Sequence, residues 1–492
     1  MRISPNTLTA GLLVGVGLSL AACNDKLLDV APRNNGDLAT ALNTTEGLDA
    51  TLNGIYDRLQ STALYGRDML ALAEALADNA QATNKSGRLN AENRNAAQAT
   101  FGNWATSYFA INQANLLLEA VPRVTALTDT NRRNSILGQG YFLRALLYHD
   151  LMRTYAYDPG VEIAQQNRGG VPLILTGVSD QSQIAFPPRA PIADVYQQLY
   201  SDLQAAIGAF SRTSANNVAY GNRQASQLLF SRVALYNKDY ANAVKYATDA
   251  IGGTVKLVDA AGYVGGWRAP RNPESVFELQ FAAIAENIGV NTSLQTTYTT
   301  LVRPGDRTST GGFGDLVPTN AFIALLDAEK SATGQSLDVR RQLYELGTAG
   351  RGTAYIESTK FLGKNGTINL DNVPVLRIPE AYLNRAEANA MLGNATAALA
   401  DVNLIRTNRG LPARTSLTGD ALLAEILLQR RLEYAFEGHR WFDLKRRGQD
   451  VVKTIPLSAT ANNIPYNDYR ILANIPVNEL ATNKNIQQNF GY

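Results

Sequence analysis

The spacing of hydrophobic residues predicts a helical hairpin between Asn222 and Gly252. One run of apolar positions ends at residues 237–239, and a second run follows, each with the interval that places its members on one face of an α-helix. The segment from Pro379 to Arg409 repeats this plan around a break at residues 393–394. Small residues recur where the two helices of a pair must approach closely: Ser231 and Ala243 in the first pair, Ala386 and Ala398 in the second.

Two further helical pairs are interrupted by long polar insertions. Their helices run over 140–155 with 191–210, and over 45–60 with 100–120. A repeat of about 34 residues per compact pair is typical of a degenerate tetratricopeptide pattern. We therefore expect a mainly α protein whose insertions leave the helical scaffold on one side as a loop-rich face. The four pairs lie near residues 45–120, 132–210, 222–252 and 376–409.

The first 22 residues are typical of an export signal. Arg2 precedes an apolar run, Leu8 to Ala22, that is too short for a membrane span of about 20 residues. Small residues end this run directly before Cys23, which is the only cysteine of the 492-residue chain. This pattern predicts a lipoprotein signal peptide at 1–22, lipidation of Cys23, and a single domain over 23–492 that a lipid anchor holds on a membrane. An ordinary secretory signal with an incidental cysteine is the alternative.

Composition narrows the kinds of ligand and chemistry. The formal charge is +2 and the basic residues are dispersed among acidic ones, so we expect a neutral ligand and no nucleic-acid partner. His149 and His439 lie far apart without a Cys/His cluster, so no metal site and no cofactor is expected. There is no GxSxG motif for nucleophilic catalysis, although a glycosidase pair of carboxylates cannot be recognised by spacing. A binding protein is favoured over an enzyme.

A motif near the C-terminus is shared by few protein families. It begins at residues 430–433 and continues as Glu-Gly-His-Arg-Trp-Phe-Asp-Leu over 437–444; further segments are 23–29, 104–115, 142–151, 170–173, 272–277 and 385–388. Together these segments resemble the SusD/RagB family of outer-membrane nutrient-binding lipoproteins over nearly the whole chain. The resemblance implies a SusD-like helical fold without catalysis. It also implies that the protein sits over a TonB-dependent β-barrel transporter and delivers a glycan, or sometimes a peptide, to it.

Charged residues recur at helical spacing through the same motif: Arg430, Arg431, Glu433, Glu437 and Arg440. This spacing predicts ion pairs between residues three or four apart along one helix, in preference to a charged ligand site. We expect Trp441 and Phe442 to be buried and to fix that helix to the scaffold.

Candidate ligand contacts come from segments rich in glycine and polar residues. Trp267 lies in a stretch, 262–270, whose glycines and proline disfavour a long helix, so we expect its indole on a loop, beside Arg268, where it can stack on a sugar. The alternative is that this indole fills the core. The other candidates are Tyr298, Phe313, Asn79 and Arg88.

Two functions therefore stay open. The first is a surface-tethered binding protein for an oligosaccharide or polysaccharide, which works by stacking and hydrogen bonding. The second is a tetratricopeptide-like scaffold or peptide-binding lipoprotein without glycan specificity. Aromatic side chains on loops favour the first function, whereas a continuous lined groove would favour the second.

Overall fold

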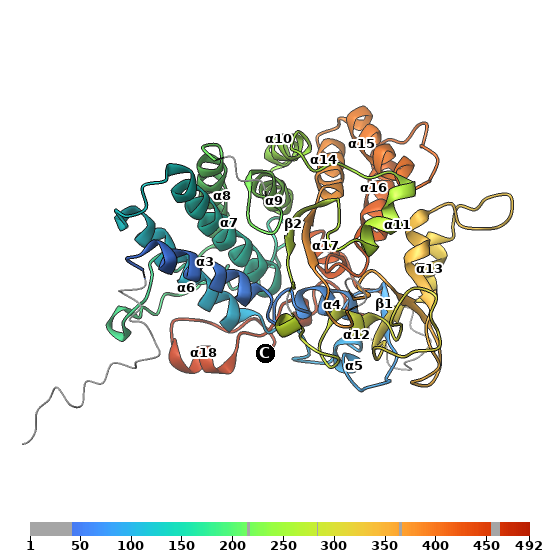
Figure 1. Ribbon diagram of the computed structural model, residues 1–492, viewed down its shortest axis with the longest axis horizontal. Coiled ribbons are helices and arrows are strands. Elements are labelled where there is room, and N and C mark those ends of the chain that lie inside the picture. The colour runs from blue at the N-terminus through green and yellow to red at the C-terminus, as the bar shows by residue number, and fades with distance from the viewer. Residues whose placement is uncertain (1–41, 214–216, 283, 364–366, 454–462) are drawn as a thin grey trace, which may run out of the picture.

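Helical hairpins packed side by side form most of the molecule (Figure 1). The computed structural model describes residues 42–213, 217–282, 284–363, 367–453 and 463–492, so the predicted signal peptide and Cys23 lie outside the described residues. Neighbouring helices contact in the order α3, α6, α7, α8, α9, α10, α14, α15, α16. Their bounds are α3 Thr45–Leu59, α6 Trp104–Ala120, α7 Thr130–Tyr155, α8 Ile192–Phe210, α9 Arg223–Tyr236, α10 Tyr240–Ile251, α14 Pro379–Met391, α15 Ala395–Thr407 and α16 Gly419–Tyr434. The four helical pairs expected from the sequence are all present.

Polar caps and small residues explain why these hairpins form where the sequence places them. The side chain of Asn222 accepts a hydrogen bond from the amide of Ala225 at the start of α9, and Asp239 caps α10 in the same way. Ser231 and Ala243 are fully buried, and the Ser231 hydroxyl donates to the Ala243 carbonyl at 3.1 Å. The predicted close approach of α9 and α10 is therefore confirmed.

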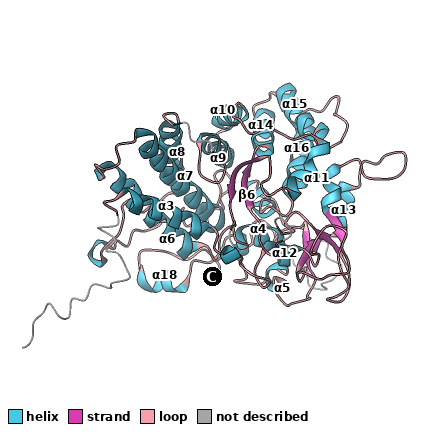
Figure 2. Ribbon diagram, viewed as in Figure 1, coloured by secondary structure: helices cyan, strands magenta, loops and turns pink. Residues whose placement is uncertain are grey.

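Shorter elements lie between and around these helices, with the β2–β6 pair between α9 and α14 (Figure 2). Three two-stranded antiparallel sheets lie among them, pairing β1 with β3, β2 with β6, and β4 with β5. The strands are β1 Ala80–Ala82, β2 Ser275–Leu279, β3 Leu316–Pro318, β4 Tyr344–Leu346, β5 Ile356–Ser358 and β6 Val373–Arg377. The remaining helices are α4 Asp68–Ala75, α5 Asn90–Asn93, α11 Ala260–Arg268, α12 Leu294–Tyr298, α13 Asn320–Leu326, α17 Arg440–Arg446 and α18 Val477–Thr482. No helix of the described chain combines the length and the apolarity that a membrane crossing requires.

The C-terminal motif forms two helices joined by a tight turn, so the prediction of one continuous helix is wrong. Helix α16 ends at Tyr434 and α17 begins at Arg440, and between them Phe436 and Gly438 have φ values of 66° and 83°. A side chain at Gly438 would place its Cβ 2.5 Å from the carbonyl oxygen of Met69, so this turn needs glycine. Trp441 and Phe442 are buried as expected, and Phe442 stacks on Phe101 with ring centroids 5.2 Å apart.

The five charges expected to pair along one helix pair across the fold instead, which corrects the second part of that prediction. Glu433 accepts hydrogen bonds from Arg377 and Arg409 at 2.9 Å, and all three side chains are buried. Glu437 binds Arg377 and Lys360, while Arg430 binds Asp443, Arg431 contacts Asp78 and Arg440 binds Asp78. These contacts join α16 and α17 to β6 and to the segment after α4. We interpret this cluster as structural, because its charged groups are largely buried and already paired with one another.

Candidate functional site

A buried carboxylate, Glu357, organises the loops on the strand-rich side. Its oxygens accept hydrogen bonds from the Thr300 amide at 2.7 Å and from the hydroxyls of Thr299 and Thr300 at 2.8 to 3.0 Å. Burial raises the pKa of Glu357, while the hydrogen bonds from Thr300 act in the opposite direction. A Cβ at Gly347 would lie 2.2 Å from this carboxyl group, so the loop carrying Gly347 passes directly over it. Glu357 thus joins the loops 299–315 and 344–358 into one surface, here called the loop face.

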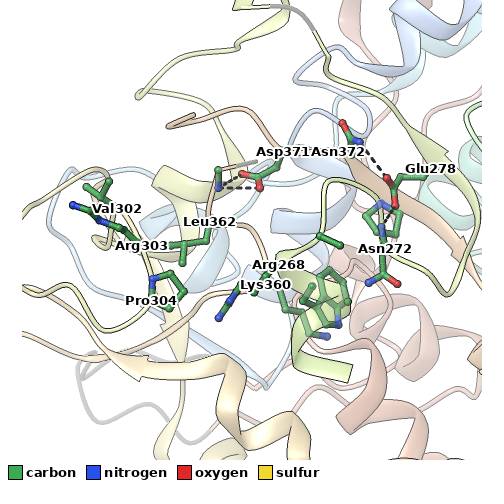
Figure 3. A pocket seen from close by; sticks show the side chains of 15 residues that line it. Arg268, Asn272, Glu278, Val302, Arg303, Pro304, Lys360, Leu362, Asp371 and Asn372 are labelled. Atoms are coloured by element: carbon green, nitrogen blue, oxygen red, sulfur yellow. Dashed lines mark hydrogen bonds between the residues drawn. The ribbon is translucent and has the colours of Figure 1, made fainter. Parts of the chain in front are cut away.

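A cavity of about 300 Å³ opens beside the loop face (Figure 3). Three parts of the chain meet there: residues 266–278 from α11 to β2, residues 302–304, and residues 360–363 with 371–374, before and within β6. Its apolar lining comes from Trp267, Ala269, Val302, Pro304, Leu362 and Pro374, and its polar lining from Arg268, Asn272, Glu278, Arg303, Lys360, Asp371 and Asn372. An apolar wall with a few convergent polar groups is the usual character of a small-molecule site.

Trp267 supplies an aromatic wall of this cavity. The residue is only 8% exposed and its ring meets Phe361 edge-on, with centroids 5.9 Å apart. Lys360 Nζ lies 4.9 Å from the indole ring and donates to Glu437 at 2.6 Å. Burial lowers the pKa of Lys360, and the charge of Glu437 acts against this. The wall is therefore rigid and is supported from behind by the structural charge cluster.

The polar rim combines fixed groups with one exposed cation. Arg268 donates to the Thr359 carbonyl and, at 2.8 Å, to the Thr359 hydroxyl, so it is held before any ligand arrives. Asp371 accepts from the Gly363 amide at 3.0 Å. The Arg303 side chain is 72% exposed and forms only a 3.3 Å ion pair with its near neighbour Asp306. Arg303 is thus the rim residue best placed to reorient toward a ligand.

Of the ligand contacts predicted from the sequence, some line the cavity and others are buried in the core. Trp267 and Arg268 both line the cavity, but Trp267 lies in the last turn of α11 and not on a loop, which corrects the local prediction. The helix continues through the three glycines at 262, 265 and 266. Asp259 caps its start, and burial of the Trp267 ring holds its end. Tyr298 and Asn79 are fully buried, so both contribute to the core and not to a surface.

Phe313 and Arg88 lie together on the loop face. The guanidinium of Arg88 is 4.3 Å from the centroid of the Phe313 ring, and that of Arg351 is 3.8 Å from it. Two guanidinium groups this close to one ring must occupy its opposite faces. Phe313 therefore has no free face for stacking on a sugar and instead holds two arginines in place.

Nothing in the sequence signalled that Val302, Pro304, Leu362 and Asn372 would meet Trp267. These residues come from segments separated by up to about a hundred positions, and each is unremarkable in its local sequence. The pairing of β2 with β6, and the contact of the Trp267 ring with Arg377 of β6, help bring these distant segments to one cavity.

The histidines are part of the core. His149 meets Tyr236 edge-on at 4.9 Å and His439 stacks on Tyr434 at 4.3 Å. Burial, aided by nearby arginines, holds the pKa of both imidazoles well below its ordinary value. Among the described residues, no group of three or more His, Cys, Asp or Glu side chains is placed to hold a metal ion.

Comparisons with known proteins find SusD-like sequences and structures that match most of the chain. Residues 351–492 match a family model described as the SusD family, and residues 26–235 match one described as starch-binding and associating with the outer membrane. SusD-like protein P2 of Formosa agariphila is 25% identical, covering 96% of this chain and 97% of the relative. A SusD superfamily structure from Bacteroides thetaiotaomicron superposes with a TM-score of 0.77 at 26% identity, covering 92% of this chain and 100% of that one. One from Bacteroides vulgatus gives 0.77 at 25% identity, with 90% and 98% covered.

Proposed function

Since the chain belongs to the SusD family, we propose that it is a lipid-anchored outer-membrane protein that binds a glycan and delivers it to a TonB-dependent β-barrel transporter. The mainly α, SusD-like fold is confirmed by the superposed structures. Starch binding is part of the description of the family model that matches residues 26–235, which supports a carbohydrate as the ligand class.

The observation that carries this proposal is the cavity lined by Trp267. Its apolar wall suits the CH faces of a sugar ring, and its rim of Arg268, Arg303 and Asp371 suits hydroxyl groups. A volume of about 300 Å³ accommodates one or two sugar units, so a longer chain would continue over the loop face. Most rim groups are already held by internal hydrogen bonds, which lowers the entropic cost of binding.

A substitution that fills the cavity tests its role. Val302 lines the cavity and is partly exposed, so Val302→Trp can occupy the space without opening the core. We expect glycan affinity to fall about tenfold or more on an array and by calorimetry. Val477→Trp is the matched control, because Val477 is 74% exposed on α18 and does not line the cavity. Equal affinity of both variants and the unmodified protein would place the glycan elsewhere.

Anchoring and delivery need a separate test in membranes. If Cys23 carries the lipid, labelled fatty acid should enter the protein but not Cys23→Ser. Gentle detergent extraction should co-purify the lipidated protein with a β-barrel transporter, and the pair should stay together through gel filtration if their interface is large. Recovery as a free monomer from membranes that contain such a barrel would count against delivery.

A further inference from the structure

Four cationic side chains lie on or beside the loop face: Lys85, Arg88, Arg307 and Arg351, here called the cationic patch. Arg88 and Arg351 flank the Phe313 ring. Direct contacts link Lys85 to Arg307 through neighbouring groups. Lys85 lies 3.6 Å from Glu357, and Glu357 lies against Gly347, whose carbonyl accepts a hydrogen bond from Arg307. The patch is thus one continuous region of the loop face.

Arg307 and Arg351 are positioned by the backbone and not by carboxylates. Arg307 Nε donates to the Gly347 carbonyl at 3.1 Å, and Arg351 Nε donates to the Gly312 carbonyl at 3.0 Å. Both residues are exposed, and within the described chain neither forms an ion pair. Their terminal nitrogens have no partner among the described residues. Each arginine therefore presents a fixed fork of donors to solvent, which is the arrangement that binds carboxylate and sulfate oxygens well.

The other two cations are a buried lysine and a half-buried arginine, and each has a buried donor atom that no described acceptor uses. The Lys85 side chain is 5% exposed, and its Nζ forms a 3.6 Å ion pair with Glu357 but no hydrogen bond within the described residues. Arg88 Nε donates to Asp315 at 3.0 Å, and the buried Nη2 of Arg88 has no partner among the described residues. Because these two atoms are buried, they add positive potential to the patch, while a ligand contacts the exposed guanidinium groups of Arg307 and Arg351 directly.

We propose that the cationic patch binds an anionic substituent of the glycan, either a uronic acid carboxylate or a sulfate ester. This inference rests on the proposed function, and it replaces the neutral ligand that the net charge of +2 had suggested. Net charge averages over the chain, whereas recognition depends on the few donors left without partners. A neutral hydroxyl can occupy one donor, but a charged group with two or three oxygens satisfies several and gains from charge assistance.

Two matched pairs of polymers test the inference with the protein extracted in detergent. Polygalacturonate is compared with its methyl ester, and dextran sulfate with dextran, by affinity electrophoresis and calorimetry. We expect at least one charged polymer to bind about tenfold or more tightly than its neutral partner, and this preference to fall as salt is added. The pair that shows the preference identifies carboxylate or sulfate as the recognised group.

The variant to compare is Arg307→Gln with Arg351→Gln, since both side chains are exposed and their loss opens no core. It should reduce the preference for the charged polymer to about twofold or less. Arg212→Gln with Arg123→Gln removes two exposed charges outside the patch; it should leave the preference unchanged and matches the net-charge change of the double variant.

The outcomes separate the inference from the proposed function. If a glycan array gives neutral ligands, and neither charged polymer is preferred, the protein is a glycan-binding protein and the cationic patch is only structural. If the preference survives the double variant, a different surface recognises the charge and the inference is overturned. If no glycan binds, charged or neutral, the proposed function fails and this inference fails with it.

Discussion

Glu433→Gln removes one negative charge from the centre of the buried cluster and tests how that cluster stabilises the fold. Glu433 is fully buried and accepts hydrogen bonds from Arg377, Arg409 and, at 3.4 Å, Arg340. Glutamine keeps the shape but leaves three buried guanidinium groups without that charge. Removing one partner of a buried ion pair costs about 3 to 5 kcal/mol, so we expect a loss of this size in the free energy of unfolding at neutral pH. Urea unfolding followed by tryptophan fluorescence measures it.

The pH dependence of this loss has a definite sign. Burial alone would raise the pKa of Glu433, but the charges of Arg409 and Arg377 outweigh it and hold this pKa well below its ordinary value of 4.5. A lowered pKa contributes stability that is complete above 4.5 and is lost as pH falls toward the folded-state value. The difference between the unmodified protein and Glu433→Gln should therefore be largest above pH 4.5 and shrink in more acidic solution.

A surface ion pair provides the matched control. Asp49 binds Arg132 with side chains 39% and 43% exposed, so Asp49→Asn should change the free energy of unfolding by less than about 1 kcal/mol. If Glu433→Gln costs no more than this control, the cluster does not stabilise the fold as argued. If the variant is too unstable to purify, the acid unfolding midpoint of the unmodified protein supplies the second measurement, and a stability that does not fall below pH 4.5 contradicts the reasoning.

Two further predictions concern buried side chains. Trp267→Ala and Trp441→Ala should each lower the free energy of unfolding by about 3 to 5 kcal/mol, because the two indoles are only 8% and 2% exposed. If the melting temperature of Trp267→Ala equals that of the unmodified protein, Trp267 is not part of the core. Burial raises the pKa of Glu74 to about 7, and the hydrogen bond from Asn79 opposes it. Since a raised pKa costs stability as pH rises from 4.5 toward 7, Glu74→Gln should gain up to roughly 3 kcal/mol relative to the unmodified protein over that range, measured by urea unfolding at several pH values.

Helical pairs were predictable because their signals are local. Apolar periodicity, capping residues such as Asn222 and Asp239, and small residues at the crossing all lie within a few turns of one another. The C-terminal motif misled because charges three or four residues apart have the same spacing whether they pair along a helix or point to different neighbours. Gly438 was the available signal, since a glycine after Phe436 permits the left-handed turn that separates α16 from α17.

The candidate site was predictable only in part, for a physical reason. Trp267 and Arg268 could be named because an aromatic residue beside a cation is distinctive in sequence. Tyr298 was named because it stands among hydroxyl residues near a glycine-rich stretch, yet it is fully buried against Phe361 and Phe436. Exposure of an aromatic ring depends on which distant segments cover it, and a single sequence does not contain that information.

The distribution of partners among the cations separates the scaffold from the loop face. In the scaffold, Arg377 and Arg409 meet buried carboxylates on several sides, and their donors are consumed by the protein itself. On the loop face, carbonyl oxygens hold Arg307 and Arg351, and the Phe313 ring also packs against Arg351; these contacts fix a guanidinium without neutralising it. A cation that has been neutralised internally gains little from an anionic ligand, because the ligand must compete with an existing pair. A cation that is fixed but not neutralised pays little to bind and gains the full charge-assisted interaction. The loop face is therefore better suited to bind an anionic ligand than the C-terminal motif, although the motif contains more charges.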